Sequence, residues 1–268
     1  QIDNSLIVNY IMSVHTHSTR MTTTRLRQMK TNGEKIAMLT SYDFTLTTLL
    51  DEAGIDMILV GDSASNIVCG NAYTLPITVD EMIFLAHGVV RAANHCLVVL
   101  DMPFGSYQIS EEDAVRNAVK IMKESGCDAL KLEGGEEILP IIKHLIQAGI
   151  PVMGHLGFTP MSINTIGGHK VQGKDADRTI DILKDALRLQ NAGCFAVVLE
   201  MLPLQSSQFI SQRLRIPTIG IGGGKFCDGQ VLVSDDLLGK YDRFKPKFAR
   251  QYSSLKDIIF NVAKAYCA

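Results

Sequence analysis

Four short apolar runs in the chain are each followed by an acidic residue that could do chemistry. The runs span 57–60, 96–100, 129–132 and 196–199, and the acids are Asp62, Asp101, Glu133 and Glu200. A continuous apolar run of this length is typical of a buried parallel strand. Because desolvating a carboxylate is costly, an acid at the end of such a strand needs a partner or a task. The pattern predicts a carboxylate-lined pocket at one edge of a parallel sheet, suited to metal binding or acid–base chemistry.

Three of these acids come from consecutive predicted strands. Asp62, Asp101 and Glu133 would therefore lie side by side, as three hard oxygen ligands. Mg²⁺ prefers carboxylate oxygens and leaves positions for water and substrate oxygens. The six cysteines form no CxxC pair or other metal-ligand spacing, so no zinc site competes. The three acids predict a magnesium site, and the alternative is that they cap loops or pair with lysine and arginine.

Three further residues at the predicted strand ends could act on a substrate. Lys131 lies two residues before Glu133, so both side chains project to one side of the strand. Lys131 could hold a substrate carboxylate or an enolate, could form a Schiff base, or could be a structural ion pair. His155 follows Gly154 and is expected to contact substrate, unless it is a buried structural histidine. Glu200 lies apart from the three acids, which favours a general base over a structural carboxylate.

The elements that must position these residues alternate regularly along the chain. Eight strands are predicted at 35–40, 57–60, 96–100, 129–132, 151–154, 196–199, 217–221 and 230–233. Helices are predicted from about residue 21 and at 43–53, 79–93, 110–125, 136–148, 177–191, 204–213 and 255–265. Eight strand–helix repeats favour a (β/α)₈ TIM barrel over a doubly wound sheet. In such a barrel the carboxyl ends of all strands meet at one face, where the active site lies.

Composition limits the classes of function. The chain has 268 residues, which fits one barrel domain over 21–268 preceded by a leader over 1–20 outside the barrel. The net charge of -2 gives no strong attraction to nucleic acid, and no apolar stretch is long enough to span a membrane. The cysteines are expected to be reduced thiols, as in a cytoplasmic protein. The leader has a composition partly like that of a transit peptide, but we favour a leader followed by a basic first helix.

Two glycine-containing segments are candidate loops at the same face. The run Gly220–Gly224 closes the seventh predicted strand and could be a phosphate-binding nest, or a tight turn that lets the backbone approach a ligand. The segment 157–177 is predicted to be a long loop, and loops of this length are often functional.

The motifs, taken in order, resemble those of the ketopantoate hydroxymethyltransferase family over nearly the whole chain from about Met21. The segments that carry the resemblance are 39–43 (LTSYD), 60–63 (VGDS), 74–78 (TLPIT), 101–104 (DMPF), 131–135 (KLEGG), 154–157 (GHLG), 168–173 (GHKVQG), 199–200 (LE), 220–222 (GIG) and 227–230 (CDGQ). The resemblance implies a barrel of the phosphoenolpyruvate/pyruvate type. It also implies transfer of a hydroxymethyl group from 5,10-methylenetetrahydrofolate to 3-methyl-2-oxobutanoate, in pantothenate and coenzyme A biosynthesis. A homodecamer of two pentameric rings is implied as well.

The same resemblance assigns roles to individual residues. The metal-side residues are Asp62, Asp101 and Glu133, and the contacts to the keto acid are Ser63, Asp101 and Lys131. We expect Asp62 and His155 to contact the substrate as well. Glu200 is the implied base that removes the C3 proton, and Mg²⁺ and Lys131 stabilise the resulting enolate. One departure is Asn71, which stands after Gly70 where the family usually has histidine. Two alternatives stay open: a Mg²⁺-dependent lyase or aldolase acting on a 2-keto acid, and a non-catalytic barrel subunit.

Overall fold

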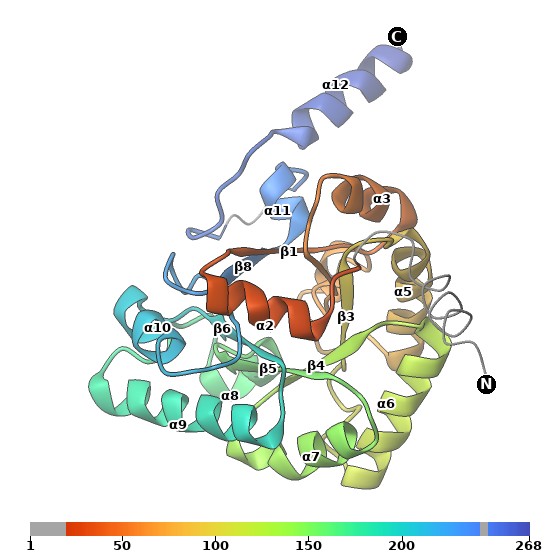
Figure 1. The fold of residues 1–268 in the computed structure, drawn as a ribbon. Coiled ribbons are helices and arrows are strands. Elements are labelled where there is room, and N and C mark those ends of the chain that lie inside the picture. The colour runs from red at the N-terminus through yellow and green to blue at the C-terminus, as the bar shows by residue number, and fades with distance from the viewer. Residues whose placement is uncertain (1–19, 242–245) are drawn as a thin grey trace, which may run out of the picture.

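The computed structural model describes residues 20–241 and 246–268, which contain a closed barrel of eight parallel strands (Figure 1). Each strand pairs with the next, and the last pairs with the first. The strands are β1 (Ile36–Thr40), β2 (Met57–Val60), β3 (Leu97–Asp101), β4 (Ala129–Glu133), β5 (Val152–Gly157), β6 (Ala196–Glu200), β7 (Thr218–Ile221) and β8 (Gly229–Leu232). The prediction of a (β/α)₈ barrel is confirmed.

The helices surround the barrel, and the local sequence explains where they begin and end. At the start of α6, the Ser110 hydroxyl accepts the N–H of Asp113, and the helix ends at Gly126 in the left-handed conformation. The helices are α2 (Thr23–Asn32), α3 (Phe44–Glu52), α4 (Ala64–Ile67), α5 (Val79–Ala92), α6 (Glu111–Ser125), α7 (Leu139–Gln147), α8 (Ile163–Ile166), α9 (Ala176–Ala192), α10 (Leu204–Ser211), α11 (Ser234–Leu238) and α12 (Leu255–Tyr266). Two 3₁₀ turns, η1 (Glu136–Ile138) and η2 (Pro160–Ser162), precede α7 and α8.

The structure differs from the sequence-based expectation in a few places. β5 extends to Gly157, so His155 lies within the strand and not after it. The predicted loop 157–177 contains η2 and α8, and the short helices α4 and α11 were not predicted. Helices of four or five residues are too short to show a helical period in the sequence. The predicted leader lies outside the described residues except for Arg20.

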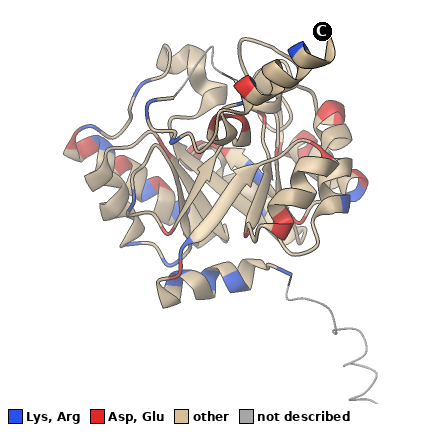
Figure 2. Cartoon of the chain, turned by 90° about the horizontal axis from the view of Figure 1, so that it is seen from above, with Lys and Arg blue, Asp and Glu red and all other residues tan. Residues whose placement is uncertain are grey.

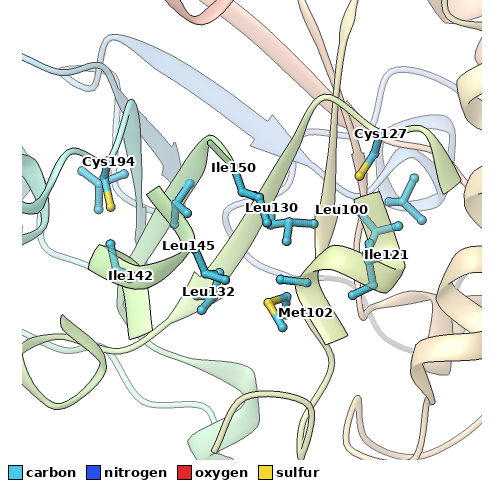
Figure 3. Close-up of a cluster of buried hydrophobic side chains, with 14 of the residues drawn as sticks. Leu100, Met102, Ile121, Cys127, Leu130, Leu132, Ile142, Leu145, Ile150 and Cys194 are labelled. Carbon is cyan, nitrogen blue, oxygen red and sulfur yellow. The ribbon is translucent and has the colours of Figure 1, made fainter. Parts of the chain in front are cut away.

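Side chains alternate along each strand between the barrel interior and the layer of surrounding helices. In β4, Leu130 and Leu132 belong to the outer core with α6 and α7 (Figure 3), whereas Ala129 belongs to the inner core. The inner core also contains Met57, Leu59, Leu97, Val99, Met153, Ala196 and Val198. Apolar side chains therefore fill the barrel interior towards the amino ends of the strands.

Helix α2 covers the barrel at the amino ends of the strands (Figure 2). Its Leu26 and Met29 are buried against the inner core, and its Lys30 forms an ion pair with Asp228 at 2.7 Å. Apolar burial and ionic contacts thus close this end, so ligands must enter at the carboxyl ends.

Aspartates just before three strands hold the neighbouring strands in place. Each accepts a backbone N–H at 2.8 Å: Asp56 from Ala37, Asp128 from Val98, and Asp228 from Thr218. These carboxylates at the amino ends are structural, in contrast to the acids at the carboxyl ends.

Among the described residues, no helix is both long enough and apolar enough to cross a membrane.

Asp51 provides the first testable prediction, because its buried carboxylate fixes the turn between α5 and β3. It accepts the backbone N–H groups of Asn94, His95 and Cys96 at 2.8–3.1 Å. Burial alone would raise the pKa of Asp51, but the N–H groups of Cys96 and His95 outweigh burial and hold the pKa well below its usual range. We expect Asp51→Asn to lower the free energy of unfolding at pH 7 by about 2 kcal/mol.

The pH dependence checks this account of Asp51. A carboxyl whose pKa is depressed by folding stabilises the protein above its unfolded pKa of about 4, and that stabilisation is lost as the pH falls through the folded pKa. Chemical denaturation should therefore show the difference between wild type and Asp51→Asn shrinking below about pH 4. Asp80→Asn, at a carboxylate that is 77% exposed, is the control and should leave stability nearly unchanged. A difference for Asp51→Asn that does not depend on pH would contradict the account.

Candidate active site

Strand alternation directs five of the predicted residues into the barrel at its carboxyl end. The inward positions are occupied by Asp101 in β3, Lys131 and Glu133 in β4, His155 in β5 and Glu200 in β6. On each strand, the inward residues nearer the amino end are apolar. Adjacent strands also place Asp101 opposite Lys131, and Glu133 opposite His155. The barrel geometry thus gathers residues that are up to 99 positions apart in the sequence.

Asp62 and Ser63 reach the same site from the loop after β2. The backbone N–H of Asp62 donates to Asp101 Oδ2 at 3.0 Å, which ties this loop to the end of β3. The Ser63 hydroxyl lies 2.8 Å from the hydroxyl of Tyr42, which follows β1. All the predicted site residues therefore lie at the carboxyl ends of neighbouring strands, as expected.

A chain of charged groups crosses the site. Lys131 Nζ lies 3.0 Å from Asp101 Oδ1 and 3.9 Å from Glu133 Oε1. It is also 3.2 Å from His155 Nδ1. His155 Nδ1 in turn lies 3.2 Å from Glu133 Oε1, and His155 Nε2 lies 3.2 Å from Glu200 Oε2. The imidazole therefore connects the predicted general base with the Lys131 cluster.

Burial makes the charges in this cluster strongly interdependent. Lys131, Asp101, Glu133 and His155 are all less than 7% exposed. Burial alone would lower the pKa of Lys131, but Asp101 and Glu133 outweigh burial and raise it. Burial and Lys131 both act to lower the pKa of His155, yet Glu133 and Glu200 raise it to about 9. Both shifts favour the protonated, positively charged form of the side chain.

The pKa values of the buried carboxyl groups are shifted in opposite directions. Burial, with the nearby charges of Glu133 and Asp101, raises the pKa of Asp62 to about 8. Burial also raises the pKa of Asp101, against the influence of Lys131. Burial opposes ionisation of Glu133 as well, but His155 and Lys131 lower its pKa below the usual value. The site holds more carboxyl groups than its own cations neutralise, which favours binding of a further positive charge.

Buried polar atoms without a hydrogen bond concentrate here. Among the described residues of the site, Asp62 Oδ2 and Thr74 Oγ1 are such atoms, whereas Asp101 Oδ1, Glu133 Oε1 and His155 Nε2 have only the ionic contacts at 3.0–3.2 Å described above. The Thr74 hydroxyl faces Asp62 and acts to lower the pKa of that carboxyl. A buried oxygen without a partner is costly, so Asp62 Oδ2 and Thr74 Oγ1 favour this position for a ligand that supplies one.

The donor set suits a magnesium ion only in part. Its oxygens are of the type that Mg²⁺ prefers, and Asp62 Oδ2 has no partner. In the parts of the chain that the structure describes, however, no three histidine, cysteine, aspartate or glutamate side chains are arranged to hold a metal ion. Glu133 is instead engaged by His155 and by the N–H of Met161 at 3.0 Å. Because Mg²⁺ typically takes one or two carboxylates together with water and substrate oxygens, this donor set fits it as a partial shell.

The backbone around Glu200 is unusually constrained. Met201 has φ 49°, and it is the one non-glycine residue with positive φ among the described residues. On the neighbouring strand, Gly157 has φ +97°, and a Cβ there would lie 2.2 Å from the Glu200 carbonyl oxygen. Strained backbone of this kind persists where the surrounding structure enforces it and is concentrated at functional sites. These two positions fix the direction in which Glu200 leaves β6.

The sequence patterns did not identify Thr74, Tyr42 or Tyr107 as part of the site. The Tyr107 hydroxyl donates to the Glu133 carbonyl at 3.1 Å. Thr74 and Tyr42 lie within quoted motifs, but their proximity to Asp62 and Ser63 depends on the fold. Asn71, the noted departure, is exposed, and its side chain donates to Ser65 Oγ at 3.1 Å.

The glycine run after β7 behaves as a tight turn. Gly222 and Gly224 have φ +64° and +81°. A Cβ on them would meet the Phe248 ring at 2.9 Å and the Leu204 side chain at 2.3 Å. Side chains of the protein fill this space, so the geometry favours the close-packed turn over the phosphate-binding nest.

Comparison with known proteins assigns the chain to a family. The sequence profile described as ketopantoate hydroxymethyltransferase matches residues 20–268. The chain belongs to the ketopantoate hydroxymethyltransferase family. It is 52% identical over 258 residues to a 3-methyl-2-oxobutanoate hydroxymethyltransferase of Pelodictyon phaeoclathratiforme, covering 95% of this chain and 93% of that protein. It is 54% identical to the protein of the same name from Chlorobium luteolum, covering 92% and 90%. The family resemblance predicted from the motifs is confirmed.

Solved structures of other proteins share the (β/α)₈ barrel fold. A phosphoenolpyruvate phosphomutase from Streptomyces platensis superposes with a TM-score of 0.63 at 14% identity, covering 93% of this chain and 86% of that one. A 2,3-dimethylmalate lyase, described as a member of the PEP mutase/isocitrate lyase superfamily, gives 0.59 at 14% identity, covering 91% and 86%. At this identity the likeness concerns the fold alone, and it agrees with the (β/α)₈ barrel of this member of the ketopantoate hydroxymethyltransferase family.

The Lys131 ion pairs lead to the second prediction. Lys131→Met removes the cation between Asp101 and Glu133 and leaves buried carboxylates uncompensated. We expect the free energy of unfolding to fall by about 3 kcal/mol in the presence of EDTA. Added Mg²⁺ should restore part of the loss, because a divalent ion replaces the missing charge. Thermal unfolding with and without Mg²⁺ measures both effects.

A matched control separates this effect from general loss of a lysine. Lys184→Met removes an exposed lysine that pairs with Asp181 at 3.3 Å, and it should change neither stability nor the response to Mg²⁺. Equal melting temperatures for wild type and Lys131→Met in EDTA would show that Lys131 does not balance the buried carboxylates.

Proposed function

We propose that the protein catalyses 3-methyl-2-oxobutanoate + 5,10-methylenetetrahydrofolate + H₂O → 2-dehydropantoate + tetrahydrofolate, a step of pantothenate and coenzyme A biosynthesis. The observation that carries the proposal is that this chain is 52% and 54% identical to curated proteins of that name, over 93% and 90% of their lengths. The set of acids, lysine and histidine at the carboxyl ends of the strands supports an active catalyst rather than a non-catalytic barrel.

We assign binding of the keto acid to Asp62, Ser63, Asp101, Lys131 and His155. The Lys131 ammonium is buried among carboxylates and already charged, so it can hold a substrate carboxylate or the oxygen of a developing enolate without reorganising. A lysine that stays protonated is a poor amine nucleophile, which favours enolate stabilisation over a Schiff base.

Glu200 is the proposed catalytic base for the C3 proton. It is more exposed than the cluster residues, with a side chain 13% accessible against 3% for His155, so it can reach a substrate lying above them. His155 Nε2, at 3.2 Å, holds one carboxylate oxygen of Glu200 and leaves the other for the proton. The C3 carbon then forms a bond to the methylene carbon of the folate, and both bonds from that methylene carbon to nitrogen break. Water supplies the hydroxyl group, and the two nitrogens take up the proton removed from C3 and the remaining proton of the water.

We propose Mg²⁺ as the cofactor, with Asp62, Asp101 and Glu133 on its side of the site, Glu133 directly or through water. When bound, Mg²⁺ supplies Lewis-acid polarisation of the keto group, which makes the C3 proton more acidic. The partnerless Asp62 Oδ2 and the raised pKa of Asp62 support a role in binding a cation. The co-substrate is 5,10-methylenetetrahydrofolate.

We further propose a homo-oligomer, a decamer of two pentamers, in the cytoplasm. Helix α12 has no buried residue and extends away from the barrel (Figure 1). Its exposed apolar side chains are Ile258, Ile259, Phe260, Val262 and Tyr266. Contiguous exposed apolar residues favour contact with another protein surface, here a second copy. All six cysteines are free thiols, which supports a reducing compartment. The expected partners are small-molecule substrates. We expect no binding to nucleic acid or to a membrane.

The decisive experiment follows exchange of the C3 proton of 3-methyl-2-oxobutanoate for deuterium by NMR. We expect exchange that depends on Mg²⁺ and occurs without folate, because proton removal precedes carbon transfer. Adding 5,10-methylenetetrahydrofolate should then yield 2-dehydropantoate. Exchange without this product would favour a lyase or aldolase on a 2-keto acid, and no exchange by the folded protein would overturn the proposed activity.

The variant Glu200→Gln tests the base in the same experiment. It keeps the size of the side chain and the contact to His155 but cannot take up a proton, so exchange should slow by about 100-fold or more. Binding of Mg²⁺ and keto acid, measured by calorimetry, should persist. Glu112→Gln, at a side chain 84% exposed, is the control and should exchange normally. Normal exchange by Glu200→Gln would remove Glu200 from this role.

The assembly gives a further prediction. Ile259→Asp places a charge on the apolar face of α12, whereas Asn261→Asp places the same charge on the opposite face. We expect sedimentation analysis to show about ten subunits for wild type and Asn261→Asp, and smaller species for Ile259→Asp. Unchanged assembly in Ile259→Asp would show that this face of α12 does not join subunits.

A further inference from the structure

The end of β4 has an incomplete strand pairing that involves Glu133. β3 ends at Asp101, which lies opposite Lys131, and the N–H of Met102 bonds the Lys131 carbonyl at 3.0 Å. Two residues further along β4, the backbone N–H and carbonyl of Glu133 also face β3, but β3 has no residue there to bond them. Buried backbone groups of this kind need another partner.

Tyr107, from the loop after β3, supplies both missing hydrogen bonds with one hydroxyl group. It donates to the Glu133 carbonyl at 3.1 Å and accepts the Glu133 N–H at 3.2 Å. Tyr107 is 1% exposed, and burial followed by the charge of Glu133 raises the pKa of its hydroxyl, which therefore stays protonated as a donor. The tyrosine thus takes the place of the next residue of β3.

The loop that carries Tyr107 is itself held rigidly. The Ser106 carbonyl accepts from the Asn117 amide at 2.7 Å, which ties the loop to α6. The Ser106 hydroxyl donates to the Pro103 carbonyl at 2.6 Å. The position of the Tyr107 hydroxyl is therefore set by α6 and the loop, and not by Glu133 alone.

Tyr107 also connects Glu133 with the segment after β5. Its hydroxyl lies 3.4 Å from Met161 Sδ, and the Met161 N–H donates to Glu133 Oε2 at 3.0 Å. The Glu133 backbone is thus held from the β3 side and its carboxylate from the β5 side. The other carboxylate oxygen remains directed at His155 and Lys131.

We propose that Tyr107 is a positioning residue for the reaction, which fixes the Glu133 carboxylate relative to His155 and Lys131 through its two hydrogen bonds to the Glu133 backbone. The effect of Tyr107 on turnover rests on the proposed function, whereas its effect on the position of Glu133 does not. Small displacements of a group that orients substrate or metal lower the rate strongly, so the hydroxyl matters to turnover although it does not touch the substrate.

The variant Tyr107→Phe removes only the hydroxyl, and Ser125→Ala, at the last residue of α6, is a matched control. The Ser125 hydroxyl, before the start of β4, likewise donates to a carbonyl, that of Ile121, and accepts an N–H, that of Cys127, at 2.7 and 3.1 Å. Ser125 is also buried, but it lies at the opposite end of the barrel from the site. Both variants should lose similar thermal stability. A difference between them in the properties of the site therefore reports on the position of the Glu133 carboxylate and not on general destabilisation.

The first readout is binding of Mn²⁺, a paramagnetic substitute for Mg²⁺, measured by electron paramagnetic resonance. We expect Tyr107→Phe to bind Mn²⁺ about tenfold more weakly than Ser125→Ala. The second is steady-state turnover, in which kcat should fall about tenfold for Tyr107→Phe with a smaller change in KM for the keto acid. Affinity and kcat equal to those of Ser125→Ala would overturn the proposal and leave Tyr107 a structural residue.

The third readout keeps this test independent of the proposed function. The ring nitrogens of His155, which contact Glu133, can be followed by NMR in protein with labelled histidine and without substrate or metal. We expect their signals to shift in Tyr107→Phe and to remain unchanged in Ser125→Ala. A shift together with an inactive wild type would count against the proposed reaction only, whereas unchanged signals would refute the positioning role even in an active enzyme.

Discussion

The Lys131 ammonium group in the barrel interior is the interaction on which the site depends. It lies 3.0 Å from Asp101 and 3.9 Å from Glu133, with all three side chains almost fully buried. In a medium of low polarity neither the cation nor the anions would be stable alone. Their mutual neutralisation permits several ionisable groups to share one small volume at the carboxyl ends of the strands.

The barrel separates stability from chemistry by its two ends. At the amino ends, Asp56, Asp128 and Asp228 accept backbone N–H groups of neighbouring strands, and α2 covers the opening. At the carboxyl ends, the acids instead contact Lys131 and His155 or lack partners. The first group is satisfied by backbone N–H groups, whereas the second is held mainly by buried side-chain charges and leaves Asp62 Oδ2 without a hydrogen bond.

Positioning within the site comes from the loops as much as from the strands. The Tyr107 hydroxyl completes the pairing of Glu133, the Asp62 N–H bonds Asp101, and Gly157 allows the Glu200 backbone to approach β5. Each contact joins neighbouring strands where the regular ladder ends. These contacts fix the side chains at the carboxyl face in advance, and preorganised groups need little reorganisation when charge develops in a reaction.

The sequence by itself determined the eight strands, the barrel and the acids at the strand ends, because buried parallel strands and capped helices leave periodic local patterns. It also identified the family through ordered motifs. Only the tertiary structure decided that His155 lies within β5 between Glu133 and Glu200, that Tyr107 and Thr74 belong to the site, and that side chains pack the glycine run. These relations depend on strand register and on loops from distant segments, for which no local pattern of residues exists.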